Sequence, residues 1–137
     1  MDLKKLADQY KDELLDNVLP FWLEHSQDHE HGGYFTCLDR KGNVFDTDKF
    51  IWLQGREVWL FSMLYNKVEK RQEWLDCAIQ GGEFLKKYGH DGNYNWYFSL
   101  DRTGRPLVEP YNIFSYTFAV MALSLIHISE PTRRSYI

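Results

Sequence analysis

Arg56 is the residue of this sequence whose surroundings most strongly suggest chemistry. It lies in residues 49–66, a segment that would be apolar on nearly every face of a helix. Such a helix is buried on all sides, and burying a guanidinium without a partner is costly. Trp52 and Trp59 flank Arg56 at positions i−4 and i+3 of one helical face. A cation between two indole rings favours a cavity wall that binds a polyol.

A structural interpretation of Arg56 is also open. In that interpretation, Arg56 pairs with a glutamate inside the core and no ligand is involved. Structural ion pairs also bring charges into protein interiors. The spacing of the residues alone therefore does not decide between a functional and a structural arginine.

A second polar cluster lies between His25 and Gly33, where His25, His29 and His31 occur together with two acidic residues. Their spacing matches none of the established zinc-binding patterns. We interpret the segment as a polar loop, and we expect no metal and no other cofactor.

Composition narrows the class of protein. A length of 137 residues predicts one domain, and a hydrophobic content of 44% provides for a core. The 17% of aromatic residues suits either a large interior or stacking on carbohydrate. The net charge of −4 argues against nucleic-acid binding, and no segment resembles a signal peptide or a membrane span. Cys37 and Cys77 form no disulfide framework, so we expect a soluble cytoplasmic protein with no membrane partner.

Hydrophobic periodicity predicts four helices and two short β-hairpins. The first and third helices are amphipathic and of the outer type, whereas the second and fourth are apolar on nearly every face. The predicted helices span residues 3–22, 50–67, 72–88 and 112–128, and the hairpins span residues 34–44 and 96–106.

The ends of the helices carry recognisable signals. Asp2, Asp48 and Asn112 are the predicted N-caps, because their side chains can accept hydrogen bonds from free backbone N–H groups. Pro20 is expected to kink or end the first helix. Gly89 is expected to end the third helix as a C′ residue.

An internal repeat relates the two halves of the chain. The pentapeptide Leu-Asp-Arg-Lys-Gly at 38–42 recurs as Leu-Asp-Arg-Thr-Gly at 100–104, an offset of 62 residues. Each hairpin follows an amphipathic helix and precedes an apolar one. Such units bury their apolar faces only against neighbouring units. The predicted fold class is therefore all-α, with two helical hairpins forming part of an α/α barrel and short β-hairpins in the connections.

The repeat also bears on Arg56. At the same offset, Arg56 corresponds to Phe118 and Glu57 corresponds to Ala119. The architecture accepts apolar residues at these positions and does not require an arginine there. The repeat therefore favours a functional role for Arg56.

These residues resemble the N-terminal signature of the N-acylglucosamine 2-epimerase family. The resemblance covers about residues 3 to 124, and cellobiose 2-epimerases and mannose-type isomerases share the scaffold. It is carried by Lys-Phe-Ile-Trp-Leu-Gln-Gly-Arg at 49–56, by Trp59, and by residues 32–40, 64–66 and 113–115.

The resemblance implies an (α/α)6 barrel and a reaction. The enzyme interconverts N-acylglucosamine and N-acylmannosamine, or a related aldose or cellobiose. One histidine removes the C2 proton of the ring-opened sugar, and a second histidine returns a proton to the other face. Arg56 matches the family's arginine, which stabilises the intermediate, and Trp52 and Trp59 are the expected substrate-binding residues.

The resemblance also bears on what this chain lacks. The family's catalytic histidines lie in later helices, so we expect the chain alone to be an inactive N-terminal fragment. A homodimeric parent is compatible with the resemblance. Residues 125–137 resemble translated sequencing-adapter read-through, with a native loop as the alternative. We therefore divide the chain into residues 1–124, part of the epimerase barrel, and residues 125–137, a non-native tail.

Two other functions remain open at this point. The first is a non-catalytic carbohydrate-binding or scaffold module built from helical hairpins. The second is an α/α-barrel glycoside hydrolase, which needs two carboxylates on either side of a sugar. Asp91 and Glu109 are available for that role, although no motif singles them out.

Overall fold

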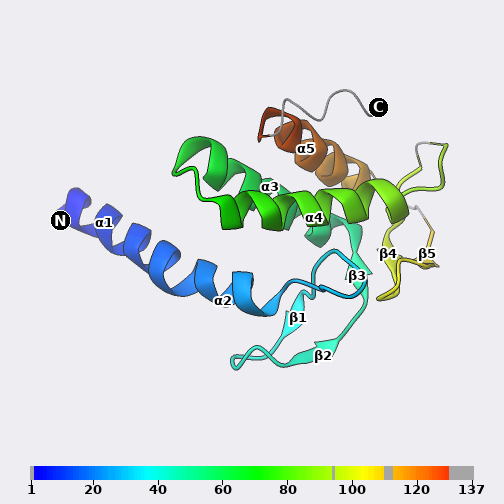
Figure 1. Cartoon of the computed structure of the whole chain (residues 1–137), viewed down its shortest axis with the longest axis horizontal. Helices are drawn as coiled ribbons and strands as arrows, with labels where there is room; N and C mark the ends of the chain where they lie inside the picture. The colour runs from blue at the N-terminus through cyan, green and yellow to red at the C-terminus, as the bar shows by residue number, and fades with distance from the viewer. Residues whose placement is uncertain (1, 94, 110–112, 130–137) are drawn as a thin grey trace.

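The computed structural model describes residues 2–93, 95–109 and 113–129 and is dominated by helices (Figure 1). The first predicted helix is a continuous rod made of α1 (Leu3–Glu13), a π-helical turn (Leu14–Val18) and α2 (Leu19–His25). It is followed by α3 (Ile51–Lys67), α4 (Gln72–Tyr88) and α5 (Phe114–Ser129). The predicted helices are confirmed to within a few residues, and the predicted cap Asn112 lies outside the described residues.

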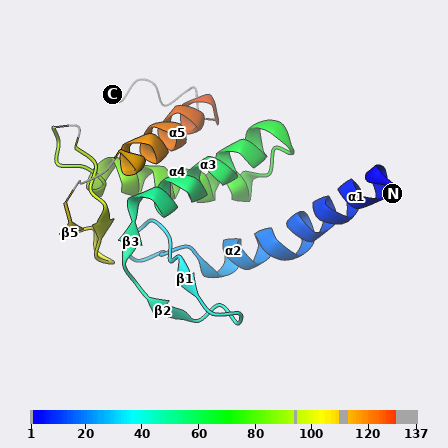
Figure 2. The ribbon, with the colours of Figure 1, turned by 180° about the vertical axis from the view of Figure 1, so that it is seen from behind.

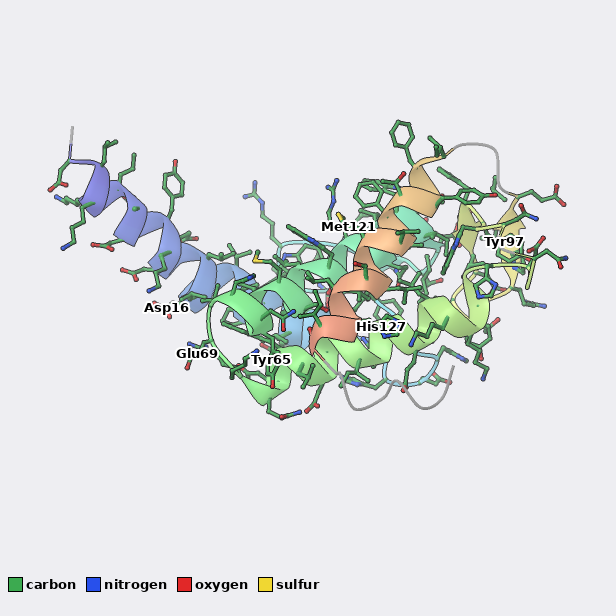
Figure 3. All side chains as sticks on the ribbon, turned by 90° about the horizontal axis from the view of Figure 1, so that it is seen from above. Asp16, Tyr65, Glu69, Tyr97, Met121 and His127 are labelled. Atoms are coloured by element: carbon green, nitrogen blue, oxygen red, sulfur yellow. The ribbon has the colours of Figure 1, made fainter. Side chains whose placement is uncertain are left out.

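The N-terminal rod projects from the rest of the molecule (Figures 1 and 2). Asp2 caps it as predicted, because its carboxylate accepts hydrogen bonds from two backbone N–H groups of the first turn. Pro20 does not end the rod, since the wider π turn before it accommodates a residue that lacks an N–H group. No residue of α1 is buried, and the helix stands apart from the other helices (Figure 3). The predicted half-buried outer helix is therefore found in the π turn, where Leu14 and Leu15 pack against the core, and in α2, which buries Leu19.

The core forms around α3, which packs against α4 and α5 (Figure 1). Residues on several faces of α3 are buried, as the all-round apolar pattern predicts. In contrast, α5 buries Ala122 and Ile126 in this core, while Val120 and Ile128 are 63% and 65% exposed. The exposed face of α5 has no cover within the described residues. This uncovered apolar face is what one part of a larger ring of helices presents.

Two small antiparallel sheets connect the helices. β1 (Cys37–Leu38) pairs with β2 (Val44–Asp46), and β4 (Ser99–Leu100) pairs with β5 (Pro106–Val108), which confirms both predicted hairpins. β3 (Lys49–Phe50) adds to the second sheet in the order β3-β4-β5. This pairing was not predicted, and it joins the first repeat to the second.

Two of the predicted helix ends are wrong in detail. Asp48 does not cap α3, because the next two residues form strand β3 and Phe50 takes the N-cap position without a side-chain bond. Gly89 does end α4, but in the right-handed helical region, with φ at −71°, and not as a left-handed C′ residue. A Cβ at position 89 would lie 2.7 Å from the ring of Trp96. Close packing therefore explains this glycine.

The hairpin turns confirm the internal repeat in three dimensions. Asp39 and Asp101 each accept hydrogen bonds from the backbone N–H groups two and four residues downstream. Gly42 and Gly104 follow with φ values of 85° and 98°, a left-handed conformation that glycine adopts without strain. The repeated Leu-Asp-Arg-x-Gly pattern therefore encodes the same turn twice.

A buried ion cluster connects the two repeats. Lys49 is fully buried, and its Nζ donates hydrogen bonds to Asp28 Oδ2 (2.9 Å) and to the carbonyl oxygens of Gly32 (2.6 Å) and Arg102 (2.8 Å). The guanidinium of Arg102 donates two further hydrogen bonds to Asp28. The polar loop of the first repeat, strand β3 and the second hairpin therefore meet at one point.

Charge pairing explains why this cluster tolerates burial. Burial alone would raise the pKa of Asp28, but hydrogen bonds from Arg102, Lys49 and the His31 N–H outweigh it and hold that pKa well below its usual range. Burial lowers the pKa of Lys49, and the hydrogen bond to Asp28 opposes this effect. Each buried charge therefore has the partners that it needs.

Removing the ammonium group of Lys49 should strongly destabilise the chain. Lys49→Met keeps an apolar stem but leaves Asp28 short of one cation and two carbonyl oxygens without their donor. We expect the free energy of unfolding to fall by about 3–5 kcal/mol, measured by urea unfolding followed by circular dichroism.

Glu69→Gln is the matched control, because it breaks an ion pair with Arg71 in which both side chains are substantially exposed. We expect that change to cost about 0–1 kcal/mol. If the two variants lost equal stability, the buried cluster would not be the connection between the repeats that we describe.

Candidate functional site

Arg56 lies on α3 beside two aromatic rings. Its guanidinium carbon is 5.1 Å from the ring centroid of Trp52 and 5.1 Å from that of Phe118. The two rings are 6.0 Å apart and tilted by 54°. Arg56 is exposed, and cation–π attraction at exposed sites is worth about 0.5–1 kcal/mol. Both rings lie to one side of the guanidinium. Cation–π attraction does not use its N–H donors in conventional hydrogen bonds, so these donors remain able to bind a ligand.

Gly55 explains how Phe118 reaches Arg56. A Cβ at position 55 would lie 2.8 Å from the carbonyl oxygen of Phe118, closer than real Cβ atoms come to other groups. The absent side chain lets α5 approach α3 at the level of Arg56. Trp52 lies one turn earlier on the same face of α3 and completes the aromatic pair.

A pocket of about 230 Å³ opens beside this aromatic pair. Its wall combines aromatic rings, one cation and one hydroxyl group. Such a wall suits a sugar, because rings stack on the apolar faces of a pyranose while N–H and O–H groups bind its hydroxyls. The lining residues are Trp52, Arg56, Phe98, Phe114, Ser115 and Phe118.

A second cavity, also of about 230 Å³, lies where α3 faces α2. Arg56 lines it as well, so the arginine separates the two spaces. The wall is mostly apolar, and the buried Oγ1 of Thr36 has no hydrogen-bond partner among the described residues. The lining residues are Val18, Trp22, Thr36, Leu53, Arg56, Glu57, Leu60 and Phe61.

Glu57 is the buried acid of this second cavity. The residue is 9% exposed, and its Oε1 lies at hydrogen-bond distance from the Oγ of Ser26 at the end of α2. Burial raises the pKa of Glu57 to about 8, and the hydrogen bond that Ser26 can donate to the ionised carboxylate opposes that rise only in part. Sequence reasoning assigned no role to Glu57, although an acid in an otherwise apolar helix was a signal that could have found it.

The structure brings together two of the three predicted site residues. Trp52 and Arg56 share the first pocket, whereas Trp59 is half-buried and lines neither of the two spaces beside Arg56. Phe118 takes the place of the second aromatic partner. The repeat aligned Phe118 with Arg56, but sequence reasoning did not place it in the site.

Arg56 has no carboxylate partner in the part of the chain that the structure describes. Its neighbour Glu57 contacts Ser26 and not the guanidinium. The structural interpretation, in which Arg56 is half of a core ion pair, therefore has no support within these residues.

The remaining candidate groups serve their own local structure. Asp91 accepts hydrogen bonds from the N–H groups of Asn93 and Asn95 in its own turn, and Glu109 is exposed. Within residues 2–93, 95–109 and 113–129, no cluster of His, Cys, Asp or Glu is arranged to hold a metal ion. Cys37 and Cys77 are both free. None of the described helices is long and apolar enough to cross a bilayer.

Comparison with known proteins gives a consistent family. The family model described as N-acylglucosamine 2-epimerase (GlcNAc 2-epimerase) matches residues 33–136. The N-acylglucosamine 2-epimerase of Mus musculus is 48% identical over 114 residues, which cover 80% of this chain and 27% of the mouse protein. The cellobiose 2-epimerase of Dictyoglomus turgidum is 31% identical over 98% of this chain and 35% of its own length. The chain therefore spans about a quarter to a third of these relatives.

The fold agrees with these sequence matches. The structure of cellobiose 2-epimerase from Bacillus thermoamylovorans B4167 superposes with a TM-score of 0.85 at 27% identity, covering 96% of this chain and 34% of that one. The helices and hairpins described above therefore form part of an (α/α)6 barrel, as the family resemblance implies and in keeping with the α/α barrel that the repeat predicts.

Adding a methyl group at position 55 should push α5 away from α3 and weaken the site. Alanine favours a helix over glycine by about 1 kcal/mol, but in Gly55→Ala the clash with the Phe118 backbone opposes that gain. We expect a lower melting temperature, measured by circular dichroism.

Gly82→Ala is the matched control, since the nearest atoms to a Cβ at that helical position lie 3.9 Å away. It should raise the melting temperature, because only the helix propensity changes. If both alanines were stabilising, the close approach of α5 at Gly55 would be disproved.

Proposed function

We propose a function from one premise: this chain belongs to the N-acylglucosamine 2-epimerase family. Its whole protein is a sugar 2-epimerase or isomerase that removes and returns the proton at C2 of its substrate. The substrates are N-acylglucosamine and N-acylmannosamine, or a related aldose or cellobiose, in keeping with the names of the relatives. The observation that carries this proposal is the exposed guanidinium of Arg56, packed against two aromatic rings at the wall of a pocket.

Arg56 stabilises the anion that forms when C2 loses its proton. An enediolate places negative charge on sugar oxygens, and a planar guanidinium can donate two N–H groups to such oxygens. Because the charge develops during the reaction, this interaction is stronger in the transition state than with the bound sugar. The rings of Trp52 and Phe118 hold the guanidinium before the substrate arrives, which reduces the entropy lost in the transition state.

Trp52 provides an apolar face on which the sugar ring stacks. Its indole lines the same pocket as the Ser115 hydroxyl, which can bind a sugar hydroxyl. Unlike the bond to Arg56, stacking does not depend on the charge that develops at C2. Trp52 therefore contributes to binding in the ground state and the transition state alike.

The groups that move the proton come from elsewhere in the barrel. Among the described residues that line the Arg56 pocket there is no histidine and no acid. This agrees with the family resemblance, which places the two proton-transferring histidines in later helices. Since this chain covers 27% of the mouse relative, we propose that the chain alone is inactive.

The proposal also covers the origin of the C-terminal segment and the cellular compartment of the protein. We propose that residues 125–137, which resemble translated adapter read-through, are non-native, although α5 continues to Ser129 and the family model matches as far as residue 136. Sequencing the gene beyond the codon for Ser124 tests this. Two free cysteines are compatible with a reducing cytoplasm.

Loss of Arg56 should slow the chemical step. In a chimera that joins residues 1–124 to the remaining barrel of the mouse relative, Arg56→Ala should lower kcat by about 10²–10³. Arg56→Lys keeps the charge but not the planar fork, so it should restore the rate only in part. The measurements are C2 epimerisation and uptake of solvent deuterium at C2. A folded Arg56→Ala chimera with near-normal kcat would refute the catalytic role, and the 137-residue chain should be inactive in both assays.

The two tryptophans should differ in the same chimera. Trp52 lines the pocket, so Trp52→Ala should mainly raise KM. Trp59 was also predicted to bind substrate, but it lies outside both spaces beside Arg56, so Trp59→Ala should raise KM less. The measurement is the KM of each variant chimera, obtained by steady-state kinetics with each substrate. A larger increase in KM for Trp59→Ala than for Trp52→Ala would place the sugar on the other side of Arg56.

A further inference from the structure

The hydroxyl of Ser26 lies between two oxygen atoms at short distances. Its Oγ is 2.5 Å from the Oε1 of Glu57 and 2.6 Å from the carbonyl oxygen of Trp22. Ser26 is fully buried at the end of α2, and Glu57 belongs to α3. Oxygen atoms come this close when a proton lies between them. The two contacts therefore need two protons.

The number of available protons identifies the state of Glu57. A serine hydroxyl carries one proton, and a backbone carbonyl carries none. If Glu57 were an ionised carboxylate, one of the two contacts would have no proton and its oxygens would repel each other. If Glu57 is a carboxylic acid, it donates to Ser26, and Ser26 donates to Trp22. Only the second arrangement makes both contacts hydrogen bonds.

The surroundings of Glu57 favour the neutral acid. The titratable groups that face Glu57 are Tyr34, which precedes β1, and Cys77, which lies on α4. Both are neutral, because burial raises the pKa of each well above its ordinary value. Arg56, next to Glu57 on α3, is held by the two aromatic rings and forms no ion pair with it. In the described part of the chain, no cation pairs with Glu57.

We propose that Glu57 is a positioning residue for Arg56 and acts as a neutral carboxylic acid that donates its proton to Ser26. The hydrogen bonds from Glu57 through Ser26 to the Trp22 carbonyl tie the Arg56 turn of α3 to the end of α2. Arg56, Glu57 and Trp22 all line the cavity between these helices. Breaking this tie lets the helices separate at the cavity and moves the guanidinium. The catalytic consequence rests on the proposed function, whereas the protonation of Glu57 does not.

The direction of the pH dependence follows from the two pKa values of Glu57. The pKa is about 8 in the folded chain and 4.5 for an ordinary glutamate. Between these two values the folded chain holds a proton that the unfolded chain has released. The contribution of Glu57 to stability is therefore complete below pH 4.5, declines as the pH rises to 8 and stays low above it.

Glu57→Gln tests the protonation directly in the full chain. The glutamine amide still donates a hydrogen bond to Ser26 but cannot ionise. The melting temperature of the wild type should therefore fall relative to Glu57→Gln as the pH rises from 4.5 to 8. Glu73→Gln, which removes an exposed acid from α4, is the control and should follow the wild type. A difference between wild type and Glu57→Gln that does not change with pH would overturn the proposal.

Carbon-13 NMR of the glutamate carboxyl groups gives a second measurement that needs no stable variant at high pH. The signal that disappears in Glu57→Gln should titrate near pH 8 in the wild type. A Glu57 signal that titrates near pH 4.5, the ordinary value for a glutamate, would show an ionised carboxylate at neutral pH and refute the inference.

Kinetics of the chimera test the positioning role. Glu57→Ala should lower kcat by up to about 10²-fold with little change in KM, because a small displacement of a catalytic group has that effect. Glu57→Gln should restore the rate at neutral pH and keep it above pH 8, where the wild type declines. If Glu57→Ala kept its kcat while Arg56→Ala lost it, the positioning role would fail and the proposed function would stand. If the chimera showed no epimerisation at all, the proposed function would fail, and the NMR titration would still decide the state of Glu57.

Discussion

A buried ammonium group determines where the central helix begins. Lys49 has three acceptors around its Nζ, and they come from two parts of the chain that are separated by about half its length. A buried lysine is stable only if all of its donors are matched, so Asp28, Gly32 and Arg102 must arrive together. Once they have done so, strand β3 is paired with β4, and α3 can start only at Ile51. The geometry of the candidate site follows from that starting point.

The site itself is shared between the two repeats. Trp52 and Arg56 come from the first turns of α3, and Phe118 comes from the corresponding helix of the second repeat. Gly55 makes their contact possible, because any larger residue would meet the Phe118 backbone. The ion cluster joins the repeats at the strands, and the glycine joins them at the helices. Neither repeat alone provides both rings against which the guanidinium packs.

Local signals in the sequence predicted most of the fold, and long-range contacts account for what they missed. The helix ranges, the Asp2 cap and the repeated Asp39 and Asp101 turns depend on neighbours within a few residues, so periodicity and turn chemistry were sufficient. The pairing of β3 with β4 and the burial of Lys49 depend on residues about 50 positions away. For the same reason Arg56 and Trp52 could be found from their spacing, whereas Phe118 could not be assigned to the site.

The repeat finally shows which part of the site the fold does not require. At the positions that correspond to Arg56 and Glu57, the second repeat has Phe118 and Ala119, and Ala119 is completely buried. The same depth in the architecture thus accepts a small apolar side chain. A glutamate in that environment is either neutral or, if ionised, destabilises the folded state. Arg56 beside it gains no ion pair that would compensate. A fold selected only for stability would favour apolar residues such as Phe118 and Ala119 in the first repeat as well. The presence of Arg56 and Glu57 there is best explained by the chemistry that they serve.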